Sequence, residues 1–327
     1  MGISPCAPVV LLGYHRPEMT AQVFQKIREA KPQHLFLVMD GPKPNDDGDA
    51  DLVTKTRAVA AGVDWDCEVH EVFAPTNLGL KKRVSSGLDE VFKHVEEAII
   101  IEDDCLPSID FFTYATELLQ RYRGEEAVGM VSGSSRLRGS TVSRYSYDFS
   151  TDVRIWGWAT WGQTWRKFSD SGDLDRHWSP EQQSTIVAKF PSGARAGAMK
   201  KMLAGEKSLD SWALPFVVHC VAQGYLNPVP ARNLVTNIGL GPSSTHTRFE
   251  SWAAHQELET LNFPLDHPDE ITANPELDRV ESAGDAREMW AYPLRHPLDA
   301  TARVVRYLAL LLRQRLGSQP GGSRISR

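Results

Sequence analysis

The sequence predicts an α/β fold with a mostly parallel sheet flanked by helices. Short apolar runs of strand length recur through the first third of the chain, and amphipathic segments of helix length separate them. Parallel strands need crossover connections, which are usually helices, so strands that alternate with helices indicate such a sheet. At 327 residues, the chain is long enough to bury a substantial core.

The predicted elements follow one another in chain order. Residues 8–13 form an apolar run that ends in glycine, which is typical of a buried strand. Residues 17–30 carry apolar side chains at helical spacing and begin with a proline, which fits the first turn of a helix. Residues 35–39 are a second buried strand, closed by the turn signal Asp40-Gly41-Pro42. The polar, acidic residues 45–51 are predicted to be a loop.

The alternation continues with a third strand at 69–73, a helix at 80–95 and a fourth strand at 98–101. Ligands of parallel α/β sheets bind beyond the carboxyl ends of the strands. Polar clusters follow three of the predicted strand ends, and we expect them to meet at one edge of the sheet: Tyr14-His15-Arg16, Asp40 and Glu102-Asp103-Asp104.

The pattern changes after residue 127. Short strands are predicted at 128–132 and 234–238, and a helix at 209–221. Residues 154–165 contain four tryptophans. Trp156 and Trp158 have the alternation of a strand, so their rings are predicted to face one side. Tryptophan dominates burial wherever it occurs, so we expect one of the four to line a binding site and the others to pack in the core.

Composition and charge exclude several classes of protein. The chain is 41% hydrophobic and 24% charged, which is ordinary for a globular protein and excludes a mainly disordered, fibrous or polytopic membrane protein. The net charge of −6 argues against a nucleic-acid partner held by phosphate contacts. No secretory signal and no apolar stretch of about 18 residues is found, and the four cysteines are scattered, so we expect a reducing, cytoplasmic location.

The last part of the chain is basic. Residues 295–327 hold seven arginines and one acidic residue, whereas the body of the chain is acidic. Residues 299–316 predict a helix with leucine and valine on one side and arginine on the other, followed by a disordered tail from residue 317. Such a helix fits peripheral contact with the anionic inner face of a membrane, and it fits equally well a helix packed on the domain.

The most informative motif is Ile99-Ile-Ile-Glu-Asp-Asp-Cys-Leu-Pro107. Three acids directly after a buried strand crowd like charges where water is scarce, which is costly unless a cation or a donor-rich ligand neutralises them. Carboxylate ligands suit Mg²⁺ or Mn²⁺, which also bind substrate phosphates. The structural alternative is an acidic turn that caps the next helix.

The sequence lacks the motifs of several common enzyme classes. The motifs of P-loop NTPases, dinucleotide oxidoreductases, zincins and α/β-hydrolases are all missing. A parallel sheet with a carboxylate cluster and no glycine-rich loop remains, and this suits a nucleotide diphosphate held through a metal.

The motifs resemble the donor half of GT-A glycosyltransferases, which have a Rossmann-like sheet. The chain is similar to the group around N-acetylglucosaminyltransferase I and to bacterial family 2-like sugar transferases, from about residue 8 to about residue 247. Glu-Asp-Asp stands where Asp-x-Asp is commoner in that superfamily. The resemblance rests on residues 8–17, 40–41, 77–82 and 100–104, and it extends to residues 110–114, 156–158 and 209–212.

The resemblance implies roles for the residues near the strand ends. Asp104 matches the acid that binds the divalent ion, which would be Mn²⁺ or Mg²⁺. Glu102 and Asp103 match acids that meet the ribose and the donor sugar, and Asp40 would accept hydrogen bonds from the base or ribose. The other residues expected at the nucleotide-sugar are Tyr14, Arg16, Asn77 and Lys81. Arg16 and Lys81 are alternatively plain surface charges, and Asp40 a turn residue.

Catalysis is assigned to the second half of the chain. Inverting transfer needs a carboxylate that takes the proton of the acceptor hydroxyl, and Asp210 stands in a matching context before Trp212. Asp210 is alternatively a helix N-cap. His246 resembles a C-terminal histidine that reaches the metal, and it is alternatively a solvated loop residue. Trp156, Trp158 and Trp212 are expected at the acceptor or sugar.

The sequence therefore predicts an inverting, metal-dependent glycosyltransferase. It would move a sugar from a nucleotide-diphosphate donor to a hydroxyl of a glycan or lipid-linked acceptor. The expected donor is a UDP-sugar. Residues 1–127 would form the donor half, 128–290 the acceptor and catalytic half, and 291–327 the tail. Two alternatives stay open: a sugar-1-phosphate nucleotidyltransferase, which should show a glycine-rich first turn, and a non-catalytic nucleotide-sugar-binding module of the same fold.

Overall fold

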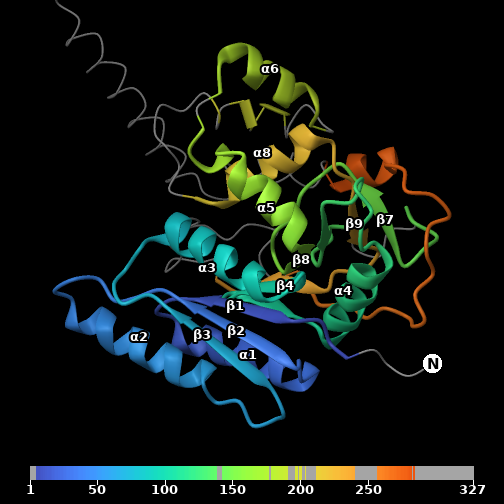
Figure 1. Ribbon diagram of the computed structural model, residues 1–327. Helices are drawn as coiled ribbons and strands as arrows, with labels where there is room; N and C mark the ends of the chain where they lie inside the picture. Colours follow the sequence, from blue (N-terminus) through green and yellow to red (C-terminus); the bar gives the residue numbers. More distant parts are fainter. Residues whose placement is uncertain are drawn as a thin grey trace, which may run out of the picture. The chain divides into compact units, whose positions relative to one another are not determined.

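A computed structural model of the chain shows an α/β fold built around one mostly parallel sheet (Figure 1). The structure describes residues 5–137, 142–176, 178–190, 196–197, 199–200, 203, 211–239, 256–281 and 283. Contacts divide the chain into two compact units, Met1–Ser282 and Ala283–Arg327. The fold and the site below belong to the first unit. The helix and tail expected in residues 291–327 lie outside the described residues.

The central sheet has six strands in the order β3-β2-β1-β4-β8-β6. The first four are parallel, and β8 runs antiparallel to both β4 and β6. Both predicted halves of the chain thus contribute strands to one sheet. The strands are β1 (Val9–Gly13), β2 (His34–Met39), β3 (Glu68–Phe73), β4 (Glu97–Glu102), β6 (Met130–Ser132) and β8 (Trp158–Trp161).

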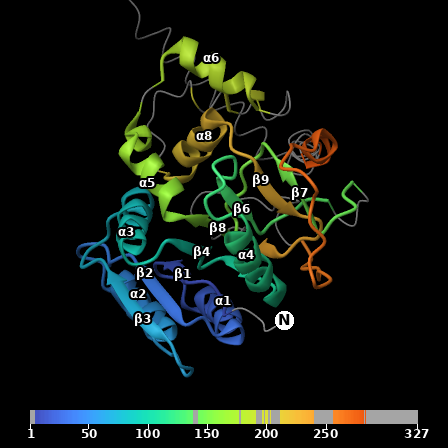
Figure 2. The same ribbon diagram turned by 45° about the vertical axis from the view of Figure 1, so that its right-hand side comes forward.

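Helices cover both faces of this sheet (Figures 1 and 2). Alternate residues of a strand point to opposite faces, so β1 sends Val9 and Leu11 into one apolar cluster and Val10 and Leu12 into another. The first cluster holds α1 (Pro17–Ala30) and α4 (Ile109–Arg121), with α2 (Asp47–Ala60) packed against α1. The second holds α3 (Leu80–His94) and α5 (Gly162–Asp170).

The structure confirms the predicted strands and helices of the first hundred residues to within two residues at each end, and corrects one prediction. Residues 45–51 are not all loop, because α2 begins at Asp47. The Asp46 carboxylate accepts a hydrogen bond from the Asp49 amide and caps the helix. The acidic run is therefore the first turn of a helix, where the helix dipole favours negative charge.

The second half of the first unit adds two small sheets and further helices. β10 (Val235–Asn237) pairs antiparallel with β5 (Cys105–Pro107), and β9 (Asn227–Pro230) with β7 (Tyr147–Ser150). The predicted helix at 209–221 is found as α8 (Ala213–Gln223). Two shorter helices, η1 (Asp173–Asp175) and α6 (Pro180–Ala188), precede it. In the described part of the chain, no helix is both long and apolar enough to cross a membrane.

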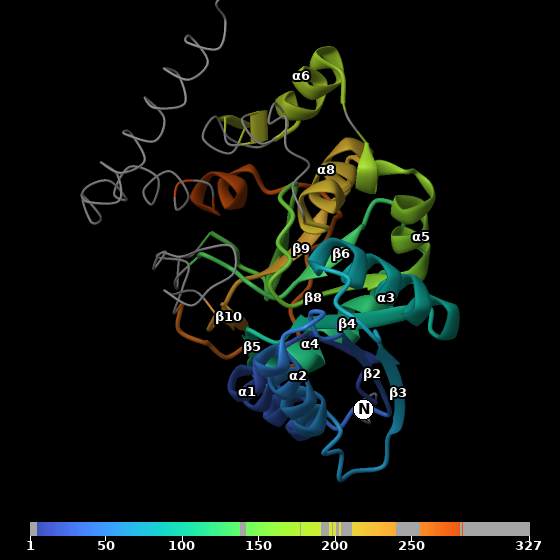
Figure 3. The ribbon, with the colours of Figure 1, turned by 90° about the vertical axis from the view of Figure 1, so that its left-hand side faces the viewer.

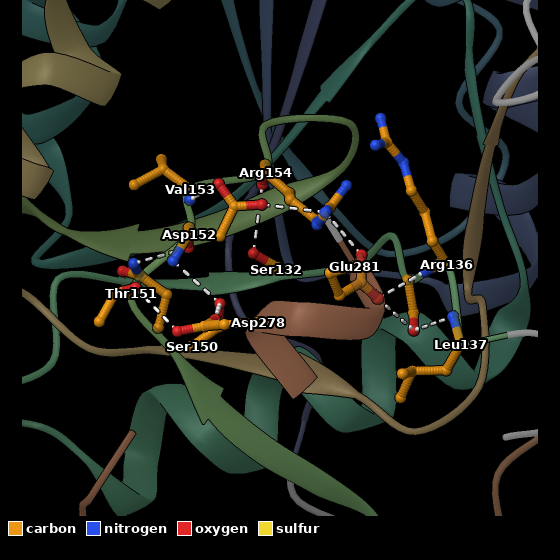
Figure 4. Close-up of polar contacts among 12 residues, drawn as sticks. Ser132, Arg136, Leu137, Ser150, Thr151, Asp152, Val153, Arg154, Asp278 and Glu281 are labelled. Carbon is orange, nitrogen blue, oxygen red and sulfur yellow. Dashed lines mark hydrogen bonds and ion pairs between the residues drawn. The ribbon is translucent and has the colours of Figure 1, made fainter. Parts of the chain in front are cut away.

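A buried charge network ties residues near position 280 to the segment that leads into β8 (Figure 4). Arg154 Nη2 lies 2.6 Å from Glu281 Oε2 and 2.9 Å from Asp152 Oδ2, and all three side chains are buried. Glu281 also accepts a hydrogen bond from the Arg136 amide. Residues 150–154 therefore have a fixed position just before Ile155 and Trp156, which matters for the site described next.

We expect Glu281→Gln to destabilise the fold, because it leaves the buried Arg154 guanidinium without one of its carboxylates. Removing one partner from a buried ion pair costs about 3 kcal/mol or more. The free energy of unfolding in urea measures this loss. Glu276→Gln is the control, because its partner Arg279 and Glu276 itself are exposed, and it should leave stability unchanged. Equal effects of the two substitutions would contradict the assignment.

Candidate functional site

A cleft of about 520 Å³ opens at the carboxyl ends of β1, β2 and β4. Its volume is in the range of small-molecule sites, roughly 300–1,000 Å³. The three polar clusters that follow the strands all line it, so the expected convergence at one edge of the sheet is present. The polar residues of its wall include Tyr14, His15, Arg16, Asp40, Asn77, Arg83, Glu102, Asp103, Asp104 and Asn237.

The three acids after β4 are close to one another and partly shielded from water. Asp103 is buried, and Glu102 and Asp104 are half-buried. Burial, together with the negative charge of Asp104, raises the pKa of Glu102 to about 8 and that of Asp103 to about 7. Arg16 opposes these shifts, with Nη1 at 2.8 Å from Asp104 Oδ2 and 3.6 Å from Asp103 Oδ1. Ionising all three carboxyls together is therefore costly in the free chain, and a bound cation would lower that cost.

Asp104 is held in place by β10. Asn237 Nδ2 donates to Asp104 Oδ1 at 3.2 Å, and the Ile238 amide donates to the Asp104 carbonyl at 2.8 Å. Gly239 passes so close that a Cβ there would lie 2.4 Å from Asp104 Oδ2. A side chain at position 239 would therefore press on the carboxylate. Asn237 and Gly239 were not predicted as site residues, since nothing in the sequence pairs the strand at 234–238 with Asp104.

Tyr14 and His15 form a stacked aromatic pair in the cleft wall, with ring centroids 3.9 Å apart and an interplanar angle of 23°. Buried Asp49 of α2 fixes both rings, with Oδ2 at 2.6 Å from the Tyr14 hydroxyl and Oδ1 at 2.7 Å from His15 Nδ1. Burial opposes ionisation of Asp49, but these bonds and one from the Lys43 amide keep its pKa below the usual value. Asp49 was missed because residues 45–51, which include the first turn of α2, were predicted to be a loop.

Asp40 is engaged by its own chain. Its carboxylate accepts hydrogen bonds from four donors. A carboxylate has about four acceptor positions, so none is left for a base or ribose. The structure therefore gives Asp40 the role of holding the turn before α3, which was the alternative interpretation. The four donors are the amides of Gly41, Leu78 and Gly79 and the side chain of Asn77.

The cationic residue of α3 that lines the cleft is Arg83 rather than Lys81. Lys81 Nζ lies 2.5 Å from Asp175 Oδ1, and Lys81 does not line the cleft. Arg83, two residues after Lys81 on α3, is 7% exposed and lines the cleft. Among the described residues, Arg83 has no ion pair, and its buried Nε has no hydrogen-bond partner. Burial lowers the pKa of Arg83, against the opposing charge of Asp40. An anion in the cleft would relieve that cost.

The tryptophans divide between the cleft and the core. Trp156 lines the cleft, whereas Trp158, Trp161 and Trp165 are buried. Trp158 stacks on Trp212, with centroids 5.6 Å apart, so it offers no free face to a sugar. Trp212 is 1% exposed, although it is among the residues that line the cleft. The expected strand alternation fails because Gly157 has a φ of +57° and β8 begins one residue later.

Two expected residues, Asp210 and His246, lie outside the described residues. The described chain resumes directly after Asp210, and Ser211, Trp212 and Ala213 all line the cleft.

The raised pKa values predict how stability depends on pH in the metal-free chain. Glu102 and Asp103 keep their protons in the folded state when the unfolded chain has released them. Their favourable contribution to the free energy of unfolding is complete below about pH 4, and it is lost as the pH rises through about 7 to 8. Asp103→Asn stays neutral, so its melting temperature should fall less than that of the wild type between pH 5 and pH 8.

Exposed Asp175 supplies the control, since Asp175→Asn removes a carboxylate outside the cleft. Its melting temperature should follow the wild type across this pH range. Parallel curves for the wild type and Asp103→Asn, measured by differential scanning calorimetry in EDTA, would show that Asp103 is ionised throughout.

Comparisons with known proteins leave this cleft unassigned. No protein-family model and no curated protein matches the sequence.

Proposed function

We propose that this chain is an inverting GT-A glycosyltransferase that uses a nucleotide-diphosphate sugar, UDP-linked, and Mn²⁺ or Mg²⁺. The acceptor would be a hydroxyl of a glycan or a lipid-linked intermediate. One observation carries the proposal: the carboxylates of residues 102–104 lie at the end of a parallel strand, in a cleft that also holds buried Arg83 and a stacked aromatic pair. This combination suits a ligand with a flat ring, phosphates and a shared cation.

The carboxylate cluster fits a hard divalent cation. Its donor set is oxygen only, and burial with like charges makes the ionised forms of Glu102 and Asp103 costly unless a cation binds. Asp104 would be the principal ligand, and Glu102 and Asp103 would meet the ion or the hydroxyls of ribose and sugar. The ion, when bound, offsets the charge that develops on the departing diphosphate.

The remaining groups would hold the donor. Arg83 and Arg16 face the phosphates, where a guanidinium can donate two hydrogen bonds to one oxyanion. The Tyr14–His15 pair supplies a flat surface for the base, and its rigid support by Asp49 lowers the entropy lost on binding. Trp156 gives an aromatic wall for a sugar.

Catalysis requires a base on the acceptor side. We assign this role to Asp210, because the residues that follow it line the cleft. Its carboxylate would take the proton of the acceptor hydroxyl as that oxygen attacks C1 from the side opposite the diphosphate, which inverts the configuration. The fold would hold the two reactants in line. His246 would complete the metal site, as the resemblance implies.

The structure favours sugar transfer over nucleotidyl transfer. A nucleotidyltransferase would need a glycine-rich first turn that brings backbone amides to the phosphates. Here the turn after β1 presents the side chains of Tyr14, His15 and Arg16 to the cleft instead.

Donor binding is expected to raise the melting temperature only when the metal site is intact. Ligand at a hundred times its dissociation constant stabilises by about 2.7 kcal/mol, so UDP with Mn²⁺ should shift the wild type by several degrees. EDTA or Asp104→Ala should abolish the shift in differential scanning fluorimetry, whereas Asp175→Asn should keep it. A full shift for Asp104→Ala would contradict the role of the carboxylate cluster.

Asp210→Asn separates an enzyme from a non-catalytic binding module. Loss of a general base lowers kcat by about a hundredfold to ten-thousandfold. The variant should keep the thermal shift with UDP and Mn²⁺ but lose transfer of radiolabelled sugar to an acceptor. Full activity of the variant would remove the assignment of the base. Absence of both transfer and donor hydrolysis in the wild type would favour the binding module.

A further inference from the structure

Three side chains of types that can bind a metal lie together at the opposite ends of the strands from the cleft. His34 opens β2 and Glu68 opens β3, and the two residues are paired in the sheet register. His70 follows two residues after Glu68, and so points to the same face of β3. One ligand atom from each of these three side chains lies within 4.8 Å of the others.

The three side chains are close enough to share one ion, and their contacts are longer than those of short ion pairs. His34 Nδ1 lies 3.3 Å from Glu68 Oε2, and His70 Nε2 lies 3.2 Å from Glu68 Oε1. Ligands bonded to one Zn²⁺ at about 2.0–2.1 Å are separated by about 3.3 Å in a tetrahedron. A charge-assisted hydrogen bond would be shorter, at about 2.7–2.9 Å. The two histidines approach different oxygens of Glu68, so small side-chain rotations would be needed to bring one carboxylate oxygen and both imidazole nitrogens to the ligand spacing of a metal.

The scaffold of the group is rigid, while its outer atoms are accessible. His70 stacks on buried Phe36, with centroids 4.3 Å apart and an interplanar angle of 8°. The ladder between β2 and β3 fixes the backbone. His34 and Glu68 are 43% and 62% exposed, so their side chains are free to adjust. His94 of α3 is near His70, but its Nε2 contacts Glu90 at 3.0 Å. We therefore place water, not His94, in the fourth position.

The ligand types separate this group from the cleft. Two imidazoles and one carboxylate suit Zn²⁺ and related transition metals, whereas the all-oxygen cluster of residues 102–104 suits Mg²⁺ or Mn²⁺. β2 runs for six residues from His34 to Met39, next to the cleft residue Asp40. At about 3.3 Å per residue, the two sites are roughly 15–20 Å apart along the sheet.

We propose that His34, Glu68 and His70 form a zinc-binding site that clips the edge strand β3 to β2, independent of the cleft. β3 is the outer strand of the sheet on this side (Figure 3), and it pairs only with β2 among the described strands. An ion bonded to both strands stabilises the folded chain because the unfolded chain does not hold the three ligands together.

Calorimetric titration of the full chain tests this site, with the metal removed beforehand and no histidine tag present. The wild type should bind Zn²⁺ with a stoichiometry of one at this site, and Co²⁺ in its place should give the intense visible absorption of a four-coordinate ion. His34→Ala and Glu68→Gln should each weaken Zn²⁺ binding at least tenfold. His70→Phe, which keeps an aromatic ring on Phe36, should do the same. Zn²⁺ should raise the melting temperature of the wild type but not of these variants.

Two variants serve as controls. His94→Ala leaves the three ligands in place, and Asp104→Ala removes the metal ligand proposed for the cleft, so both should bind Zn²⁺ as the wild type does. Three outcomes would overturn the proposal: the wild type does not bind Zn²⁺, the three ligand variants bind it as tightly as the wild type, or either control loses binding. The Asp104→Ala control also separates the two proposals. If the zinc site fails its test, the melting-temperature shift expected with UDP and Mn²⁺ is unaffected.

Discussion

The electrostatic repulsion among Glu102, Asp103 and Asp104 is the constraint on which the site depends. The buried strand β4 ends where water is scarce, and burial raises the pKa values of the first two carboxyls. The surrounding fold holds these groups together despite that cost, through the Arg16 ion pair and the Asn237 hydrogen bond. Groups kept in an unfavourable arrangement by their surroundings are typical of functional sites, and the partner that we propose for them is a divalent cation.

The fold was largely predictable because its signals are local. Buried parallel strands are apolar runs, and helices such as α1 show apolar side chains at helical spacing, so both were found to within two residues. The helix α2 was not predicted. Polar residues alone do not distinguish a loop from a capped first turn, and the distinguishing bond, from the Asp49 amide to Asp46, exists only in the folded chain. The pairing of β5 with β10 joins residues 130 positions apart, and no local pattern encodes it.

The site was predictable where residues follow strand ends, and less so elsewhere. The positions of Arg16 and of the three acids follow from the sheet topology. The direction of a side chain on a helix depends on packing, so the sequence suggested Lys81 where Arg83 enters the cleft. Trp158 was assigned to a ligand, but stacking on Trp212 places it in the core. The stacked pair of Tyr14 and His15 depends on a carboxylate 34 positions further on in the chain.

The most direct test is a crystal structure of the chain with UDP and Mn²⁺, in which anomalous diffraction locates the manganese. If the carboxylates exist to hold a shared cation, an anomalous peak should appear within about 2.5 Å of an Asp104 oxygen and bridge to the diphosphate. Arg83 should then contact a phosphate oxygen. A cleft that binds UDP without manganese, or no anomalous peak while Asp104 keeps its bonds to Arg16 and Asn237, would contradict the account.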